Sequence, residues 1–353
     1  MALIDLLKVL VQRKGSDLHL KAGTQPRGRI DGQLVPLAEQ ALQQSDMMNF
    51  VNQILDEGQK KHLGRHCDLD RVYVCPAGRF RVNVFRQDNS LAIVMRVIPT
   101  TIPSIDQMGL PPVLKTIADT HRGIVLVTGT TGSGKSTTLA AMINHINETK
   151  ACNVITIEDP VEFRHSDKKS LVSHRSIGVD VPSFGHALKY VLRQDPDVIL
   201  IGEMRDLETI ETAITASETG HLVFSTVHTT DAPQTVERIV TAFPQDHREQ
   251  VRQQLATNLK AVISQRLLKR PGGGRLAALE IMLTTPTVKK QIMENELKKL
   301  YNTIKEGTTE GMQTFNQVLF GFVEQNLITR EDALAAANRP EELMLELRTS
   351  GLT

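Results

Sequence analysis

The residues with the clearest chemical signature form the run Gly129-Thr130-Thr131-Gly132-Ser133-Gly134-Lys135-Ser136. The run follows the apolar residues 124–127 and precedes a predicted helix at 137–147. This order matches the phosphate-loop pattern G-x-x-x-x-G-K-[ST], whose glycines let backbone N–H groups surround a polyphosphate beside the positive end of a helix. We therefore expect Gly129 through Thr137 to bind a nucleoside triphosphate. Lys135 would reach the β- and γ-phosphates, and the Ser136 hydroxyl would ligate Mg²⁺.

Carboxylates that follow two apolar runs are candidates for metal binding and for water activation. Glu203 comes after the apolar residues 198–201, a loose Walker B pattern, and is expected to hold Mg²⁺ directly or through water. The segment 158–162 adds three more carboxylates, one of which could orient the attacking water. Acids in loops are often only solvated, but a position at the end of an apolar strand favours a site.

Two histidines, His221 and His228, flank the predicted strand 222–227. A single histidine at a strand end is more often structural than catalytic. Because two of them bracket one strand, we expect His228 to sense the γ-phosphate and His221 to have a packing or relay role. No third His or Cys lies at ligand spacing, which argues against a metal site built on this pair.

The elements that must position these residues alternate between apolar strands and amphipathic helices. The predicted strands are 124–127, 154–157, 198–201 and 222–227, and the predicted helices are 183–194, 207–219, 234–242 and 246–268, followed by mostly short helices in 286–353. Short continuous apolar runs are typical of a parallel sheet that is covered on both faces. Ligands of such sheets bind outside the carboxyl ends of the strands. The pattern thus gathers the candidate residues at one edge of an α/β domain.

Residues 1–98 show a different pattern, that of a small α+β domain. Helices are predicted at 3–11 and 45–63 and strands at 80–85 and 91–98. Alternation places Arg81 and Arg96 opposite the apolar stripes of the two strands, where arginines are usually solvated. Residues 99–112 carry four prolines and are predicted to be a linker to the second domain, 113–353.

The composition restricts the class of function. Lys and Arg number 41 against 40 Asp and Glu, so no excess charge draws the whole chain to nucleic acid or anionic lipid. Aromatic residues make up 4% and tryptophan is absent, which argues against base-stacking platforms. No apolar run approaches the roughly 20 residues of a membrane span, and no signal peptide is visible. We expect a cytoplasmic protein without direct membrane insertion, which reaches a membrane through a partner.

Three further blocks resemble the Asp box, the atypical Walker B motif and the His box of the secretion ATPase superfamily. They are Glu158-Asp159-Pro160-Val161-Glu162, then Leu192-Arg193-Gln194-Asp195-Pro196-Asp197 with Ile201-Gly202-Glu203-Met204-Arg205-Asp206, and then His221-Leu222-Val223-Phe224-Ser225-Thr226-Val227-His228-Thr229-Thr230. The early Gly15-Ser16-Asp17-Leu18-His19-Leu20 and the late Gly311-Met312-Gln313-Thr314-Phe315 narrow the resemblance to the twitching-motility branch, the PilT and PilU family of type IV pilus retraction ATPases. The resemblance covers almost the whole chain.

The resemblance implies a PAS-like N-terminal domain, a RecA-like P-loop NTPase domain and a homohexameric ring. It also implies that Glu162 activates water, that Glu203 serves Mg²⁺, and that Arg81 and Arg96 approach the nucleotide, which overrides the expectation of a solvated surface. The expected activity is hydrolysis of ATP with Mg²⁺ to retract a type IV pilus. The expected partner is an inner-membrane pilus platform protein at the pilus base.

Two features separate the branches of the superfamily. Extension ATPases normally carry a long extra N-terminal region and a tetracysteine zinc site, whereas this chain begins at the PAS-like domain and its three cysteines form no C-x-x-C pair. It therefore resembles a retraction motor. PilT-type motors carry an Ala-Ile-Arg-Asn-Leu-Ile-Arg-Glu block after the final strand, where this chain has Thr287-Val288-Lys289-Lys290-Gln291-Ile292. The difference favours an accessory, PilU-like motor that acts beside a second retraction ATPase.

Two other classes of function compete with the pilus motor. One is a RecA-fold motor that translocates DNA or RNA, against which the balanced charge and the few aromatic residues argue. Salt-dependent nucleic-acid binding would identify it. The other is an ATP-gated binding module with little turnover, which the kinetics of phosphate release would distinguish from a motor.

Overall fold

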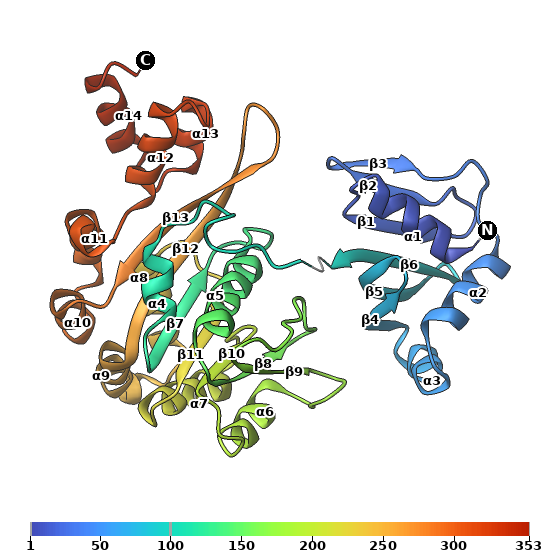
Figure 1. The fold of residues 1–353 in the computed structure, drawn as a ribbon, viewed down its shortest axis with the longest axis horizontal. Helices are drawn as coiled ribbons and strands as arrows, with labels where there is room; N and C mark the ends of the chain where they lie inside the picture. Colours follow the sequence, from blue (N-terminus) through green and yellow to red (C-terminus); the bar gives the residue numbers. More distant parts are fainter. Residues whose placement is uncertain (1, 99–100, 353) are drawn as a thin grey trace. The chain divides into compact units, whose positions relative to one another are not determined.

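The computed structural model describes residues 2–98 and 101–352. The chain divides into two compact units, Met1–Thr101 and Ile102–Thr353 (Figure 1). The predicted linker begins with Pro99 and Thr100, which lie outside the described residues. Farther along that segment, Ile105 and Leu110 are buried in a core of the second unit. The chain is therefore already part of the second unit well before residue 113.

The first unit is an antiparallel sheet whose core lies between one sheet face and the helices. The strand order is β3-β2-β1-β6-β5-β4. Its core includes Leu7 and Phe50 from helices and Phe80, Val82 and Ile93 from strands. The elements are α1 (Leu3–Gln12), β1 (Asp17–Lys21), β2 (Arg27–Ile30), β3 (Gln33–Pro36), α2 (Gln44–Ile54), α3 (Glu57–His66), β4 (Asp68–Cys75), β5 (Gly78–Gln87) and β6 (Ser90–Ile98).

The predicted helix at 45–63 is wrong as a single element. Leu55 is extended and ends α2, and Asp56 then starts α3 by accepting a hydrogen bond from the backbone N–H of Gln59. The Gln59 side-chain oxygen in turn accepts a hydrogen bond from the Asp56 backbone N–H, which completes a capping box. This box is visible in the sequence as Asp-x-x-Gln, and it stabilises the break.

The second unit is built on a seven-stranded sheet in the order β13-β12-β7-β11-β10-β8-β9. All neighbouring pairs are parallel except β12 with β13. The strands are β7 (Gly123–Thr128), β8 (Asn153–Glu158), β9 (Leu171–Ser176), β10 (Val198–Ile201), β11 (Leu222–Val227), β12 (Leu259–Lys269) and β13 (Arg275–Leu283). The four predicted strands of the parallel sheet are therefore confirmed, and three further strands extend it.

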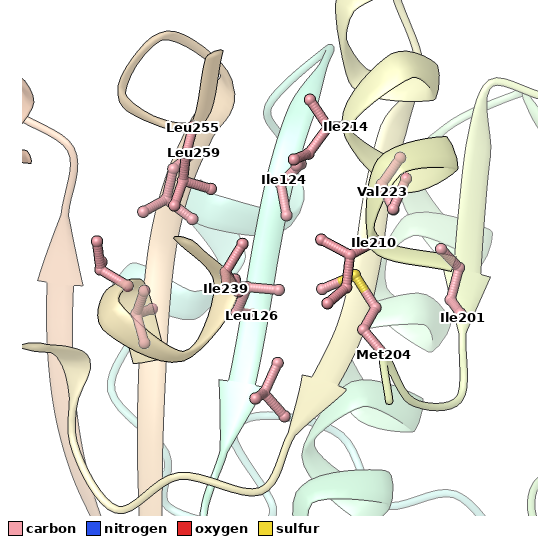
Figure 2. Close-up of a cluster of buried hydrophobic side chains, with 14 of the residues drawn as sticks. Ile124, Leu126, Ile201, Met204, Ile210, Ile214, Val223, Ile239, Leu255 and Leu259 are labelled. Carbon is pink, nitrogen blue, oxygen red and sulfur yellow. The ribbon is translucent and has the colours of Figure 1, made fainter. Parts of the chain in front are cut away.

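Helices cover both faces of this sheet, as the apolar strands predicted. One core joins the sheet to α6 through α11, and Figure 2 shows part of it, with Ile239 beside Leu126 and Ile210 beside Met204. A second core joins the opposite face to α4 and α5. These helices are α4 (Val113–Ala118), α5 (Lys135–Thr149), α6 (Phe184–Val191), α7 (Leu207–Glu218), α8 (Ala232–Thr241), α9 (Arg248–Asn258), α10 (Pro286–Met293) and α11 (Leu300–Glu306).

The predicted helix 246–268 is wrong over its second half. Helix α9 ends at Asn258, and β12 runs from Leu259 to Lys269 beside β7. Strand β12 is buried over most of its length, so it lacks the polar–apolar alternation that marks a half-exposed strand. Its β-branched residues Val262 and Ile263 fit a strand. Backbone pairing with β7 on one side and β13 on the other favours the strand over a helix here.

The short C-terminal helices have a core of their own. They are α12 (Phe315–Glu324), α13 (Arg330–Ala336) and α14 (Pro340–Thr349). Phe315, Leu319 and Leu343 pack there with Leu268 of β12 and Ala278 of β13, so the helices lie beside the β12–β13 hairpin (Figure 1). No helix in residues 2–98 or 101–352 combines the length and the apolar character that crossing a membrane requires.

Candidate nucleotide site

The predicted phosphate loop lies between the buried strand β7 and the first turn of α5. All six residues of β7 are buried, and α5 begins at Lys135. Gly129, Gly132 and Gly134 have φ angles of 142°, 80° and 90°, which only glycine adopts without strain. The Ser133 hydroxyl is buried and, among the described residues, has no hydrogen-bond partner. This geometry fits a loop that wraps around an anion.

Lys135 connects the loop to two of the predicted acids. Its ammonium nitrogen donates hydrogen bonds to the carbonyl oxygens of Gly129 and Thr130, at 2.8 and 2.9 Å. Burial lowers the pKa of Lys135 below its ordinary value, while the charges of Glu203 and Glu162 act in the opposite direction. Both carboxylates are thus close enough to the lysine to influence its charge. The fold brings these three predicted residues together.

The parallel register brings the carboxyl ends of the central strands level. Ile201 of β10 lies opposite Ile157 of β8 and Ser225 of β11, and Val227 of β11 lies opposite Thr128 of β7. The polar residues that follow these strands therefore emerge at one edge of the sheet. The expected meeting of the polar groups at this edge is confirmed.

Glu203 and His228 form a pair at this edge. The Glu203 carboxylate lies 3.5 Å from the His228 Nε2 atom and 2.7 Å from the Arg205 Nε atom. The Glu203 side chain is only 16% exposed, whereas His228 is 45% exposed and is available to a ligand. The His221 Nδ1 atom lies 2.8 Å from the Ala216 carbonyl oxygen near the end of α7. Its packing or relay role stays a prediction.

Glu162 follows β8 and is held through its backbone. Its N–H donates to the Glu158 carboxylate at 3.3 Å, which leaves the Glu162 carboxylate outside that bond. Glu158, Ser136 and Thr226 line a cavity of about 30 Å³ between α5 and the strand ends. Glu203 and Arg205 line a larger cleft of about 370 Å³ beside α6 and α7. Glu158 and Glu203 thus border hollows at the site, whereas Glu162 is not among the residues that line either one.

Arg81 and Arg96 belong to the first unit and face away from its core, as alternation predicted. They lie directly opposite each other on β5 and β6. Like charges in this position repel, and each arginine has an acid nearby. Arg96 Nε lies 2.8 Å from the Asp17 carboxylate, and Arg81 Nε lies 3.8 Å from that of Asp70.

Two polar contacts to this site were not predicted from the sequence. One is Arg205, whose ion pair with Glu203 depends on the turn that follows β10. The other is Gln265, whose side chain reaches the phosphate loop from β12. A polar residue inside an apolar segment was the only available signal for Gln265, and the incorrect helix assignment obscured it.

Comparison with known proteins identifies the family. The family model described as "Type II/IV secretion system protein" matches residues 3–334. The chain belongs to this secretion system family. Among curated relatives, the type IV pilus retraction ATPase PilT of Pseudomonas aeruginosa is 44% identical over 342 residues, which cover 97% of this chain and 99% of the relative. The type IV pilus ATPase PilU of the same organism is 40% identical over 345 residues, which cover 97% of this chain and 90% of the relative.

A solved structure extends the match to the fold. A crystal structure of the pilus retraction motor PilT with bound ADP superposes with a TM-score of 0.91 at 42% identity, covering 97% of this chain and 98% of that one. The predicted PilT and PilU resemblance and the predicted α/β fold class are confirmed. The fold is that of a secretion system family member with a small α+β unit before its P-loop unit.

Proposed function

We propose that this chain is a hexameric ATPase motor that powers retraction of a type IV pilus. The observation that carries the proposal is the phosphate loop, which lies at the same sheet edge as the Glu203–His228 pair. The extent of the match to relatives named as pilus retraction ATPases supports the mechanical role. The balanced charge of the chain favours this role over transport of nucleic acid.

The nucleotide would be ATP, held by Gly129 through Thr137. The left-handed glycines and the buried Ser133 hydroxyl support this assignment, because they leave loop N–H groups and one O–H group for phosphate oxygens. The same edge fits Mg²⁺, since the Ser136 hydroxyl and the Glu203 carboxylate supply the oxygen ligands that this ion prefers. When bound, Mg²⁺ neutralises charge on the β- and γ-phosphate oxygens.

The remaining residues have separate roles in hydrolysis. Glu162 would accept the proton of the attacking water, because its carboxylate is not held by the bond that fixes its backbone. His228 would sense the γ-phosphate, because it is half-exposed and its ring nitrogen is already oriented by Glu203. Arg81 and Arg96 would supply positive charge to a nucleotide once a ring assembles.

The proposed partners are further copies of this chain and an inner-membrane pilus platform protein, and the motor would act on the cytoplasmic side of the pilus base. The sequence of residues 287–292, which lacks the block of PilT-type motors, favours an accessory role beside a second retraction ATPase. Deletion of the gene, alone and together with that ATPase, tests this role. If the motor is accessory, cells that lack only this gene should twitch normally as long as their pili retract without load.

The experiment that tests the main proposal is complementation. In cells that keep the second retraction ATPase, loss of this gene should weaken retraction under load. The wild-type gene should restore that retraction, whereas a gene carrying Lys135→Ala should not. Equal retraction under load with the wild-type gene, with the Lys135→Ala gene and without the gene would refute a role in retraction.

A further inference from the structure

Strand β12 reaches the phosphate loop through one buried side chain, that of Gln265. Its Nε2 atom donates a hydrogen bond to the Ser133 carbonyl oxygen at 2.8 Å. Its Oε1 atom accepts a hydrogen bond from the Thr138 hydroxyl at 2.7 Å. Gln265 is 1% exposed and Thr138 is fully buried. One amide therefore ties the loop to the first turns of α5.

The glycines of the loop are fitted to the same strand. A Cβ atom at Gly134 would lie 2.8 Å from the Gln265 Nε2 atom, and one at Gly129 would lie 2.4 Å from the Gln265 carbonyl oxygen. Real Cβ atoms essentially never approach so closely. The loop therefore has room only for glycine at the two positions where it meets Gln265. This residue lies more than 100 positions later in the chain and outside the strand–loop–helix motif.

We propose that Gln265 is a positioning residue for nucleotide binding. It fixes the Ser133 peptide and the beginning of α5, so that the loop N–H groups keep the orientation a polyphosphate needs. The chemistry of the residue suits the task, because the neutral amide donates and accepts at once without placing a charge beside phosphate. This inference rests on the proposed ATPase function and adds a residue that acts on binding through the loop.

The test replaces Gln265 by methionine, which has a similar length and cannot make either hydrogen bond. Loss of two buried hydrogen bonds should raise KM for ATP about tenfold and weaken binding of a fluorescent ADP derivative by a similar factor. The value of kcat should stay within about threefold, because Gln265 does not contact the reacting atoms. Gln265→Glu should bind nucleotide more weakly still, because a carboxylate cannot donate to the Ser133 carbonyl and repels phosphate.

Ser264 provides a matched control. Its hydroxyl accepts a hydrogen bond from Thr128 at 2.9 Å, in an equally buried bridge between β12 and β7 that does not contact the loop. Ser264→Ala should lower the melting temperature without changing KM or ADP binding. An equal rise in KM for this variant would mean that general loosening of β12 causes the effect, and would overturn the proposal.

Substitutions at Thr138 test the same bond from the other side. Thr138→Val removes the hydroxyl and should weaken ADP binding, whereas Thr138→Ser keeps it and should bind as the wild type does. If Gln265→Met fails to fold, the two Thr138 variants still test the positioning role of Gln265. Equal binding by both Thr138 variants, or wild-type binding by Gln265→Met, would refute the positioning role. A wild-type protein that binds no ADP and hydrolyses no ATP would instead refute the proposed function.

Discussion

At Lys135, burial and charge act in opposite directions on one ammonium group. Burial lowers the pKa of Lys135, and the nearby Glu203 and Glu162 partly restore it. The ammonium is already bound to two loop carbonyls, at 2.8 and 2.9 Å. A phosphate in the loop would therefore compete with the protein's own oxygens for Lys135, and as a charged acceptor it would make the stronger hydrogen bond.

The first prediction concerns this lysine. Lys135→Ala should reduce kcat/KM for ATP at least about 100-fold, because the variant lacks a positive group at the developing charge. The fold should persist, since the change leaves two carbonyls without a donor rather than opening an apolar core. Steady-state phosphate release and circular dichroism provide the measurements. Turnover near the wild-type rate in a folded variant would contradict the assignment of the loop.

The second prediction separates the two acids. Glu162→Gln should bind ATP with Mg²⁺ normally and lose about 10² to 10⁴ in turnover, because an amide cannot accept the proton of water. Glu203→Gln should in addition raise the Mg²⁺ concentration needed for half-maximal activity. Magnesium titrations of both variants give the measurement. An identical shift in Mg²⁺ requirement for the two would show that they share one role.

Glu280 leads to the third prediction, on pH. This buried side chain of β13 accepts a hydrogen bond from the backbone N–H of Ala232 at 3.0 Å. Burial raises the pKa of Glu280 to about 7, with Asp231 acting in the same direction and Arg266 against it. Since the folded-state pKa lies above the unfolded one, the folded protein holds more protons between about pH 4.5 and 7. Its unfolding free energy therefore falls as the pH rises through this window.

Glu280→Gln removes this proton linkage, because glutamine stays neutral. The unfolding free energy of the variant minus that of the wild type should increase by on the order of 2 kcal/mol between pH 5 and pH 8, because only the wild type loses stability over this range. Urea unfolding at the two pH values is the measurement. A difference between variant and wild type that does not change with pH would show that Glu280 has an ordinary pKa.

At the scale of elements, the segments that carry Glu203 and His228 are each followed closely by a helix with a defined start. Asp206, three residues after Glu203, caps α7 by accepting from the Thr209 N–H at 2.9 Å. Asp231, three residues after His228, caps α8 by accepting from the Gln234 N–H at 2.9 Å. Each cap limits where the preceding polar residue lies, because the helix that it starts is packed against the sheet.

The fourth prediction follows from the first of these caps. Asp206→Ala should lower the unfolding free energy by about 1 kcal/mol, because the N–H of Thr209 loses its acceptor. Turnover should fall as well, since the Glu203 segment is less constrained. Asp246→Ala, at an exposed position whose side chain makes no capping bond, is the control and should change neither quantity. Wild-type stability of Asp206→Ala would show that the cap contributes nothing.

The sequence predicted those parts of the site that depend on nearby residues. The phosphate loop, the acid after β10 and the outward faces of Arg81 and Arg96 follow from local pattern or alternation. Contacts made by distant strands could not be predicted, because register and pairing are tertiary. Gln265 reaches the loop only because β12 pairs with β7, and Asp17 meets Arg96 only because β1 pairs with β6.

At the scale of the whole molecule, the proposed chemistry is divided between two units. The phosphate loop and the acids lie in the second, and the paired arginines lie in the first. Arg96 and Arg81 have acidic partners within their own unit, so each guanidinium must exchange a carboxylate for phosphate if it is to assist hydrolysis. Such an exchange conserves charge pairing and permits repeated engagement and release.

The fifth prediction tests this division. Arg81→Ala and Arg96→Ala should each lower ATP turnover by about 10³-fold while leaving ADP binding and oligomer size unchanged. Arg65→Ala, at an exposed position of α3 in the same unit, is the matched control and should retain full activity. Phosphate release and size-exclusion chromatography are the measurements. Full turnover in both arginine variants would place these residues outside the reaction.

The separate core of α12 through α14 has a consequence for how such motors diverge. These helices pack on one another, and among the described residues their core includes Leu268 and Ala278 from the β12–β13 hairpin, with the partly buried Leu276 packed against it. Arg266, the neighbour of Gln265 on β12, lies over the Phe315 ring and donates hydrogen bonds to the Ala336 carbonyl and the Asn338 side chain, so substitutions at these contacts would reach β12. Helix α14 lies beyond residue 334, where the family model ends. The exposed surface of α14 can therefore vary among relatives while β12 and the phosphate loop keep their geometry.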